Sequence, residues 1–338
     1  MLAPALDRVP RVALAGGPTP LEYLHRFSAA VGAPVWIKRD DIGSLGLAGN
    51  KVRKLEYLLA AAQAAGATAL LTVGALQSNH VRATASAAAR LGMRCVALLG
   101  DDRPSAPVGN HLLDLLFGAE VEFMGPLSWA ELDAALVGRS AALQAAGERP
   151  FAIPMGGSTG LGAIGLARGY AELVDQLAEA KVEAGRVVHA SSSGGTSAGL
   201  EVGRAMVGHG PLICGVAVAK TPGVLEDEIT ALANAAAGII GLDRTWSAAE
   251  IHLDHDHLGP AYGVPTAEAS AAIRLLARTE GILADPVYSG KALAGLIDLV
   301  RSGSDTGPLV FWHTGGTPAL FDPHYGLPLA GEAVRTDD

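Results

Sequence analysis

Residues 69–85 read ALLTVGALQSNHVRATA, and this stretch sets the fold of the chain. Residues 69–73 are a continuous apolar run, which predicts a strand that is buried on both faces of its sheet. Four polar residues follow at positions 77–80, and an Ala-rich helical stretch begins at Val81. A buried strand followed by a polar turn and a helix is the repeating unit of an α/β protein.

The same alternation of strand and helix continues through most of the 338 residues. Further apolar runs predict strands at residues 95–99, 187–190, 213–218 and 309–312. Glycines stand where the intervening helices should end, at Gly66, Gly92, Gly118, Gly147 and Gly281. We therefore expect an α/β fold with open, parallel, twisted sheets that are covered by helices.

The length of the chain favours two domains. Gly-rich breaks occur at residues 43–49 and 154–160. If the chain crosses between domains at both breaks, residues 48–162 form a small α/β domain inserted into a large domain made of residues 1–47 and 163–338. A simple division into an N-terminal and a C-terminal half is the alternative, and composition alone does not choose between the two.

Composition excludes several classes of partner. The net charge is −9 and no run of Lys or Arg occurs, which argues against binding to nucleic acid or to an anionic membrane surface. Cys95 and Cys214 lie inside apolar runs and are expected to be buried and unpaired. The cluster at residues 252–257 matches no metal-site spacing, so no metal is expected. Without a signal peptide or an apolar span, the sequence favours a cytoplasmic protein.

Lys51 is the first candidate catalytic residue. It opens a segment, residues 51–59, whose apolar residues recur at helical spacing. Cations are disfavoured at the N-terminus of a helix, so the helix dipole does not account for a lysine at this place. The neighbouring charges of Arg53 and Lys54 would favour a neutral, nucleophilic amine. An ordinary surface lysine is the alternative.

Two loops between a strand and a helix are suited to anions. The first holds four consecutive polar residues, Gln77, Ser78, Asn79 and His80. Backbone N–H groups and polar side chains converge at such a loop, which suits a substrate carboxylate, although Ser78 or Asn79 could simply cap the helix. The second consists of small residues that would let the main chain wrap a phosphate, Ser193, Gly194, Gly195 and Thr196. A tight turn is the alternative for the second loop.

Two C-terminal segments, residues 285–291 and 313–318, place hydroxyl groups and glycine at the edge of apolar runs. A neutral hydroxyl from Ser289 or Thr314 could hold a pyridine nitrogen without protonating it. Tyr288 or Tyr262 could serve as an acid or an orienting group. An amine, a carboxylate site and a phosphate cradle are together what an enzyme dependent on pyridoxal phosphate (PLP) needs, whereas each residue alone also has a structural interpretation.

The motifs resemble one family of PLP-dependent enzymes. The similarity extends from about Pro18 to Phe321, and the segments that carry it are 18–21, 36–41, 49–54, 77–80, 285–292 and 313–316. They are similar to those of D-cysteine desulfhydrases and 1-aminocyclopropane-1-carboxylate (ACC) deaminases. The resemblance implies the tryptophan-synthase-β-like fold, with a small domain inserted into a larger one, and a homodimer.

The resemblance also implies roles for the candidate residues. Lys51 would be the Schiff-base lysine, Asn79 would bond the 3′ oxygen of the cofactor, and residues 193–196 would hold its phosphate. Gln77, Ser78 and the adjoining backbone would hold the substrate carboxylate, beside His80. Tyr262 and Tyr288 would flank the substrate, and Thr314 or Ser289 would face the pyridine nitrogen.

Two positions distinguish the reactions within this family. ACC deaminases resemble this chain but carry glutamate where Ser289 stands and glutamine where His80 stands. Both departures favour β-elimination from a small amino acid, with D-cysteine first, giving pyruvate, hydrogen sulfide and ammonia. An L-cysteate sulfo-lyase and an ACC deaminase-like enzyme are alternatives, and a non-catalytic small-molecule binding protein is the alternative from a different class.

Overall fold

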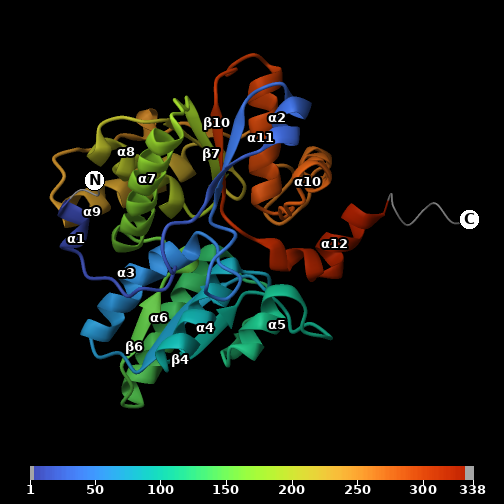
Figure 1. Cartoon of the computed structure of the whole chain (residues 1–338). Helices are drawn as coiled ribbons and strands as arrows, with labels where there is room; N and C mark the ends of the chain where they lie inside the picture. Colours follow the sequence, from blue (N-terminus) through green and yellow to red (C-terminus); the bar gives the residue numbers. More distant parts are fainter. Residues whose placement is uncertain (1–3, 332–338) are drawn as a thin grey trace, which may run out of the picture.

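Two β-sheets, which draw on different parts of the chain, organise the molecule (Figure 1). This computed structural model describes residues 4–331. The first sheet has four strands in the order β5-β4-β3-β6, and all of its pairs are parallel. Its strands are β3 (Ala69–Gly74), β4 (Arg94–Leu99), β5 (Glu120–Phe123) and β6 (Pro150–Ile153).

The second sheet has six strands in the order β1-β2-β10-β7-β8-β9. All of its pairs are parallel except that β1 runs antiparallel to β2. Its strands are β1 (Leu21–Tyr23), β2 (Val35–Arg39), β7 (Arg186–Ser191), β8 (Leu212–Ala217), β9 (Leu253–Asp254) and β10 (Leu309–His313). Because β2 is paired with β10, a division of the chain into two sequential halves would cut through this sheet.

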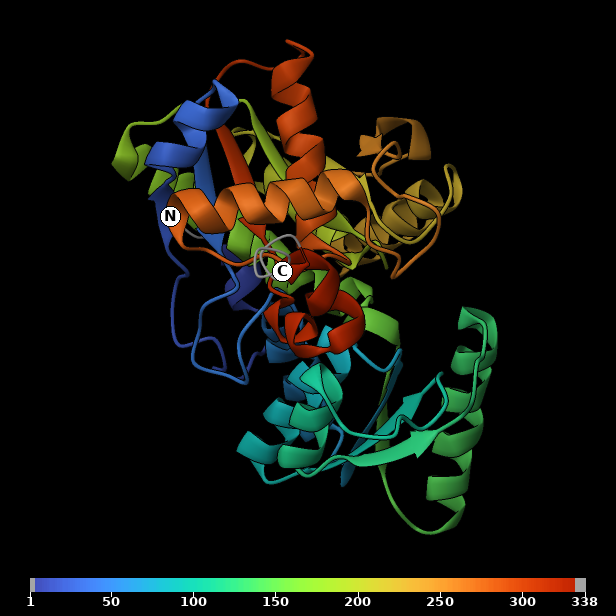
Figure 2. The ribbon, with the colours of Figure 1, turned by 90° about the vertical axis from the view of Figure 1, so that its right-hand side faces the viewer.

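Helices cover both sheets, as the parallel strands require. Around the first sheet lie α4 (Asn79–Leu91), α5 (Gly109–Leu116) and α6 (Trp129–Ala145). In Figures 1 and 2 the second sheet has α7, α8 and α9 on one side and α2, α10 and α11 on the other. These helices are α2 (His25–Val31), α7 (Gly160–Ala180), α8 (Gly195–Val207), α9 (Val224–Ile240), α10 (Ala267–Glu280) and α11 (Ser289–Arg301). The remaining helices are α1 (Pro4–Asp7), α3 (Lys51–Ala64), α12 (Pro323–Ala330) and the short η1 (Met155–Gly157), η2 (Ala248–Glu250) and η3 (Thr317–Phe321).

The structure confirms the α/β fold class and the five strands predicted from apolar runs. It adds five strands, which are β1, β2, β5, β6 and β9. A search for apolar runs misses β2 because this strand ends in Lys38 and Arg39. Lys38 is fully buried, and its ammonium group donates hydrogen bonds to Glu172 and to the backbone oxygen of Thr19. A buried ion pair thus takes the place of the apolar contacts that usually identify a buried strand. Cys95 and Cys214 are buried and free, on β4 and β8.

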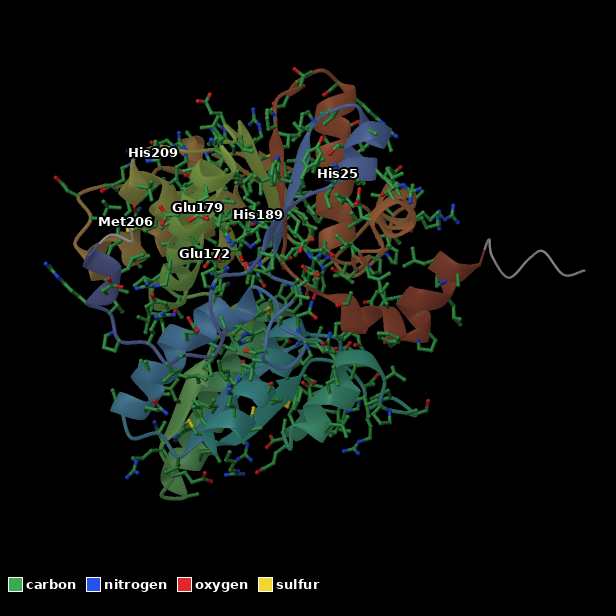
Figure 3. The ribbon with its side chains drawn as sticks, in the orientation of Figure 1. His25, Glu172, Glu179, His189, Met206 and His209 are labelled. Carbon is green, nitrogen blue, oxygen red and sulfur yellow. The ribbon has the colours of Figure 1, made fainter. Side chains whose placement is uncertain are left out.

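A buried ionic cluster fixes the position of α3, the helix that Lys51 begins. The Arg53 guanidinium donates to both carboxylate oxygens of Asp40 and to Glu172, which projects from α7 (Figure 3). These opposite charges keep the carboxyl pKa of Asp40 below its usual value despite burial. The two helices touch closely, since a Cβ on Gly165 of α7 would lie 2.0 Å from the Arg53 backbone oxygen. The cluster therefore locks the start of α3 against the second sheet.

No helix within residues 4–331 is both long and apolar enough to cross a membrane.

Candidate active site

A pocket with about 800 Å³ of empty volume lies at the carboxyl ends of strands from both sheets. Ligands of α/β proteins bind at this edge, where strand ends and helix N-termini converge. The residues predicted from sequence that line it are Lys51, Ser78, Asn79, His80, Ser193, Gly194, Thr196, Tyr262, Tyr288 and Thr314. Gln77, Gly195 and Ser289 do not line the pocket. The structure thus gathers most of the predicted residues from segments that are far apart in the sequence.

Lys51 is the first residue of α3, and its amine lies in the pocket wall. Burial lowers the pKa of this amine from 10.5 to about 8. About a tenth of the amine is therefore neutral at pH 7 and about half at pH 8, and the neutral form is the nucleophile. The sequence-based reason was partly wrong, because Arg53 turns away from the pocket toward Asp40 and Glu172. Removal of the amine from water, rather than that neighbouring charge, lowers the pKa.

Lys54, one helical turn after Lys51, is a site residue that sequence reasoning missed. It is fully buried, and its amine donates to the Gly156 backbone oxygen at 3.0 Å and to Ser158 Oγ at 3.1 Å. Burial and then the charge of Lys51 hold its pKa well below the usual value. A buried amine with neutral partners alone favours an anion beside it. The spacing of three residues between the two lysines was the available signal, because it places both on one face of a helix.

The anion would lie where β7 leads into α8. Gly194 has a φ of 73°, a left-handed conformation that side chains other than glycine rarely adopt, and α8 begins at Gly195. A Cβ on Gly195 would lie 2.6 Å from Lys54 Nζ and 2.7 Å from Ser158 Oγ, so a larger residue there would displace these two polar groups. Ser193 and Ser158 bond through their hydroxyls at 2.8 Å. Backbone N–H groups at a helix start, hydroxyls and a buried amine form a cradle that fits a phosphate.

Within the loop at residues 77–80, Ser78 and Gln77 have different roles. Ser78 caps α4, since Val81 N donates to Ser78 Oγ at 3.3 Å, which confirms the capping interpretation. Ser78 also lines the pocket, and its binding of a substrate carboxylate stays a prediction. The Gln77 side chain is directed elsewhere. Its Nε2 donates to the Val108 backbone oxygen and to Asp322, and its Oε1 accepts from the Asn110 N–H. The Gln77 side chain therefore supports the loop from behind.

His80 is held in its neutral form. Burial first, and then the charges of Lys51 and Lys54, keep its pKa well below the usual value. The Thr72 hydroxyl donates its single hydrogen to the Ile153 backbone oxygen, so the 3.0 Å contact with His80 Nε2 requires Nε2 to donate. His80 Nδ1 is then an acceptor, with no partner among residues 4–331.

Tyr262 and Tyr288 meet at the pocket through a hydrogen bond between their hydroxyls. Burial raises the pKa of both phenols above the usual value, so both stay protonated at neutral pH. One hydroxyl hydrogen lies between the two oxygens, which leaves the other available to a ligand. Trp129, from α6, packs edge-on against Tyr262 with ring centroids 5.2 Å apart. No local sequence pattern indicates that Trp129 lines the pocket.

Of the two hydroxyls considered for a pyridine nitrogen, only Thr314 lines the pocket. The Ser289 hydroxyl accepts from the Asp285 N–H at 2.8 Å and donates to Asp285 Oδ1 at 2.5 Å. Asp285 also accepts hydrogen bonds from three N–H groups at the start of α11, those of Val287, Tyr288 and Ser289. Ser289 thus belongs to a capping arrangement that fixes the backbone at Tyr288. No carboxylate lines the pocket among the described residues.

The histidine-rich segment does not form a metal centre in the described part of the chain, where no group of three metal-ligating side chains gathers. His255 pairs with Glu226 at 2.8 Å and His257 with Asp254 at 2.6 Å.

Comparison with known proteins identifies the class to which this pocket belongs. The family model described as "Pyridoxal-phosphate dependent enzyme" matches residues 12–315. The chain belongs to this family, and pyridoxal phosphate is its cofactor. The cradle and the free amine of Lys51 fit that cofactor on their own chemistry.

Particular relatives are similar over nearly the whole chain. A protein named D-cysteine desulfhydrase from Salmonella typhi is 45% identical over 326 residues, which cover 94% of this chain and 98% of the relative. Its namesake from Salmonella choleraesuis has the same identity and coverage. A solved structure, "Crystal Structure Analysis of the ACC deaminase homologue", superposes with a TM-score of 0.89 at 37% identity, covering 97% of both chains.

Proposed function

We propose that this enzyme is a β-eliminating lyase that converts D-cysteine into pyruvate, hydrogen sulfide and ammonia. The observation that carries the proposal is one pocket that holds a free amine of low pKa, an anion cradle and a loop suited to a carboxylate, yet no acidic side chain among the described residues. The similarity to two D-cysteine desulfhydrases supports the choice of substrate.

The chain's residues would hold the cofactor at both ends. The amine of Lys51 would attach to it covalently, and Lys54 and residues 193–196 would bind its phosphate. Asn79 would donate to the oxygen on the ring, and Thr314 would face the ring nitrogen. When bound, the cofactor supplies an electron sink that stabilises negative charge at the Cα of an amino acid.

The substrate would be oriented by its carboxylate at Ser78 and the adjoining backbone of the loop. Lys51 lines the same pocket and would take the Cα proton at Nζ. Tyr262 and Tyr288 lie at the pocket with one free phenolic hydrogen, which can be donated to the departing sulfur. Cleavage of the Cβ–S bond releases hydrogen sulfide, and addition of water to the remaining three-carbon product gives pyruvate and ammonia.

The absence of a carboxylate among the described pocket residues favours elimination over ring opening. A carboxylate beside a pyridine nitrogen keeps that nitrogen protonated and deepens the electron sink. The neutral hydroxyl of Thr314 leaves a weaker sink, which suffices when a good leaving group departs as charge develops. Opening of a cyclopropane ring has no such leaving group, so ACC is the poorer substrate.

The test measures pyruvate released from D-cysteine, L-cysteine, L-cysteate and ACC by the purified enzyme. The proposal expects the highest kcat/KM on D-cysteine and loss of turnover in Lys51→Ala. Preference for L-cysteate would favour a sulfo-lyase. Pyruvate release that survives in Lys51→Ala would refute the assigned chemistry. Absence of a visible cofactor band and of turnover on all four would favour a binding protein.

We also propose that residues 48–162 form a small domain inserted into a large one made of residues 1–47 and 163–338. The strand membership of the two sheets supports this division. A cytoplasmic homodimer that acts on a small amino acid completes the proposal. The acidic net charge of −9 supports one part of it, the absence of nucleic acid and anionic membrane partners.

A further inference from the structure

A buried hydrogen-bond network lies directly behind the loop that carries Ser78 and Asn79. Its centre is Asn110 on α5, which is fully buried and does not line the pocket. Asn110 Nδ2 donates to the Gln77 backbone oxygen at 2.9 Å and to Asn79 Oδ1 at 3.0 Å. Its N–H donates to Gln77 Oε1 at 2.8 Å. The side chain and the backbone N–H of Asn110 thus hold two positions of the loop, Gln77 and Asn79.

Arg82 fixes the direction of the hydrogen bonds that the Asn110 side chain makes. The Arg82 guanidinium can only donate, and its Nε approaches the Asn110 amide at 2.8 Å, so the atom it meets must be Asn110 Oδ1. Asn110 Nδ2 then lies on the other edge of the amide, where the Gln77 backbone oxygen confirms it as a donor. The Asn79 atom that it meets must therefore be the oxygen.

It follows that Asn79 turns its Nδ2 away from Asn110. Asn79 lines the pocket, and no described residue accepts a hydrogen bond from this nitrogen. An isolated asparagine could present either edge of its amide to a ligand, because the two orientations have nearly the same shape. Here the chain of bonds from Arg82 through Asn110 selects the donor edge.

Arg82 also reaches the loop that precedes Lys51. Its Nη2 donates to the Ala48 backbone oxygen at 3.1 Å. Leu47 and Ala48 have φ values of 61° and 49°, a left-handed conformation that is strained for residues other than glycine. A strained loop persists only when its surroundings hold it, and Arg82 supplies one of these holds. The same guanidinium therefore touches the support of Asn79 and the approach to Lys51.

We propose that Asn110 and Arg82 are positioning residues, which orient the Asn79 amide so that its N–H donors face the cofactor and tie this orientation to the loop before Lys51. The inference rests on the proposed role of Asn79 and goes beyond it, since neither positioning residue reaches the pocket. Asn110→Asp is the informative change. It keeps an oxygen for Arg82 but places a second oxygen against Asn79 Oδ1, which favours rotation of the Asn79 amide and presents its oxygen to the cofactor.

The experiment measures the visible absorbance band of the holoenzyme and the dissociation constant of pyridoxal phosphate. In Asn110→Asp we expect a shifted band and cofactor binding weakened roughly tenfold, as for the loss of one hydrogen bond to a charged oxygen. Asn110→Ala removes the donor without adding a repulsion. It should change the band and the dissociation constant in the same direction but by a smaller amount, and it replaces Asn110→Asp in the test if that variant does not fold.

Asp114→Asn is the matched control, because it makes the opposite exchange of oxygen and nitrogen one turn further along α5. Burial raises the pKa of Asp114 to about 8, so its side chain is mostly neutral near neutral pH, and its oxygens have no hydrogen-bond partner within residues 4–331. The Asp114 side chain interacts with the charge of Arg82 but makes no hydrogen bond to Arg82, Asn110 or Asn79, so the visible band of Asp114→Asn should be unchanged.

A double-variant cycle separates the proposed role of Asn79 from the proposed positioning by Asn110. If Asn110 acts through Asn79, Asn110→Asp adds no further band shift once Asn79 is changed to Ala. An effect of Asn79→Ala together with none from Asn110→Asp or Asn110→Ala would overturn the inference and leave the proposed function standing. No effect of Asn79→Ala would refute the proposed role of Asn79 itself, and the inference with it.

Discussion

Replacing Lys51 with methionine should stabilise the apoenzyme, although it removes the amine on which the proposed chemistry depends. Methionine has a similar length and no charge, so it fills the same space without the cost of burying an ammonium group. The amine has a pKa of about 8 in the folded protein against an ordinary 10.5, a difference of 2.5. At about 1.4 kcal/mol per unit, burial of the charged form costs roughly 3 kcal/mol.

The pH dependence follows from the direction of the shift. A lysine whose pKa is lowered by folding releases its proton more easily in the folded state, so the unfolded state binds more protons between about pH 8 and 10.5. The cost is therefore nearly complete below pH 8 and disappears as the pH rises past 10.5. The increase in the free energy of unfolding caused by Lys51→Met should be largest at neutral pH and should decrease between about pH 8 and 10.5.

Urea unfolding of both apoenzymes at a series of pH values measures the difference in the free energy of unfolding. Lys181→Met, at an exposed lysine beyond the end of α7, is the control and should change stability by less than about 0.5 kcal/mol at every pH. A Lys51→Met variant that is no more stable than the parent near neutral pH, or whose advantage does not change with pH, would show that the amine is well solvated and refute the reasoning.

Three further predictions concern the cofactor and the substrate. Gly195→Ala should reduce retention of pyridoxal phosphate during dialysis, because its Cβ would lie 2.6 Å from Lys54 Nζ; unchanged occupancy would move the phosphate site elsewhere. Thr314→Val should shift the visible cofactor band whereas Ser289→Ala should not, since only Thr314 lines the pocket; the reverse result would assign the ring nitrogen to Ser289. Turnover of D-cysteine should exceed that of ACC by at least about 100-fold, roughly 3 kcal/mol in the barrier, and equal rates in pyruvate assays would contradict the elimination mechanism.

The sequence by itself determined the fold class and supplied candidate residues, most of which line the pocket. Continuous apolar runs identified five buried strands, and the loops after them supplied the candidate residues. These signals are local, because a strand end and the helix that follows it are adjacent in the chain. Parallel strands place their carboxyl ends at one edge of a sheet, so residues such as Ser78 and Gly194 could be expected at a common site.

Tertiary structure alone decided what each side chain faces. Ser289 and Thr314 were equivalent in sequence, and only the bonds of Ser289 to Asp285 removed it from the pocket. Gln77 looked like a ligand-binding residue, yet its amide is held by Asp322 and by Asn110. The contacts of Gln77 join residues that are 33 and 245 positions apart in the sequence, so no local pattern reports them.

The pKa of Lys51 shows most clearly what the sequence determines and what the tertiary structure decides. The sequence placed a lysine at a helix start beside two other cations, which correctly predicts a lowered pKa but gives an incomplete reason. Its value depends on how much water the surrounding elements exclude, and those elements come from both sheets. Exclusion of water is a property of the packed structure, since desolvation requires atoms on every side of the charge.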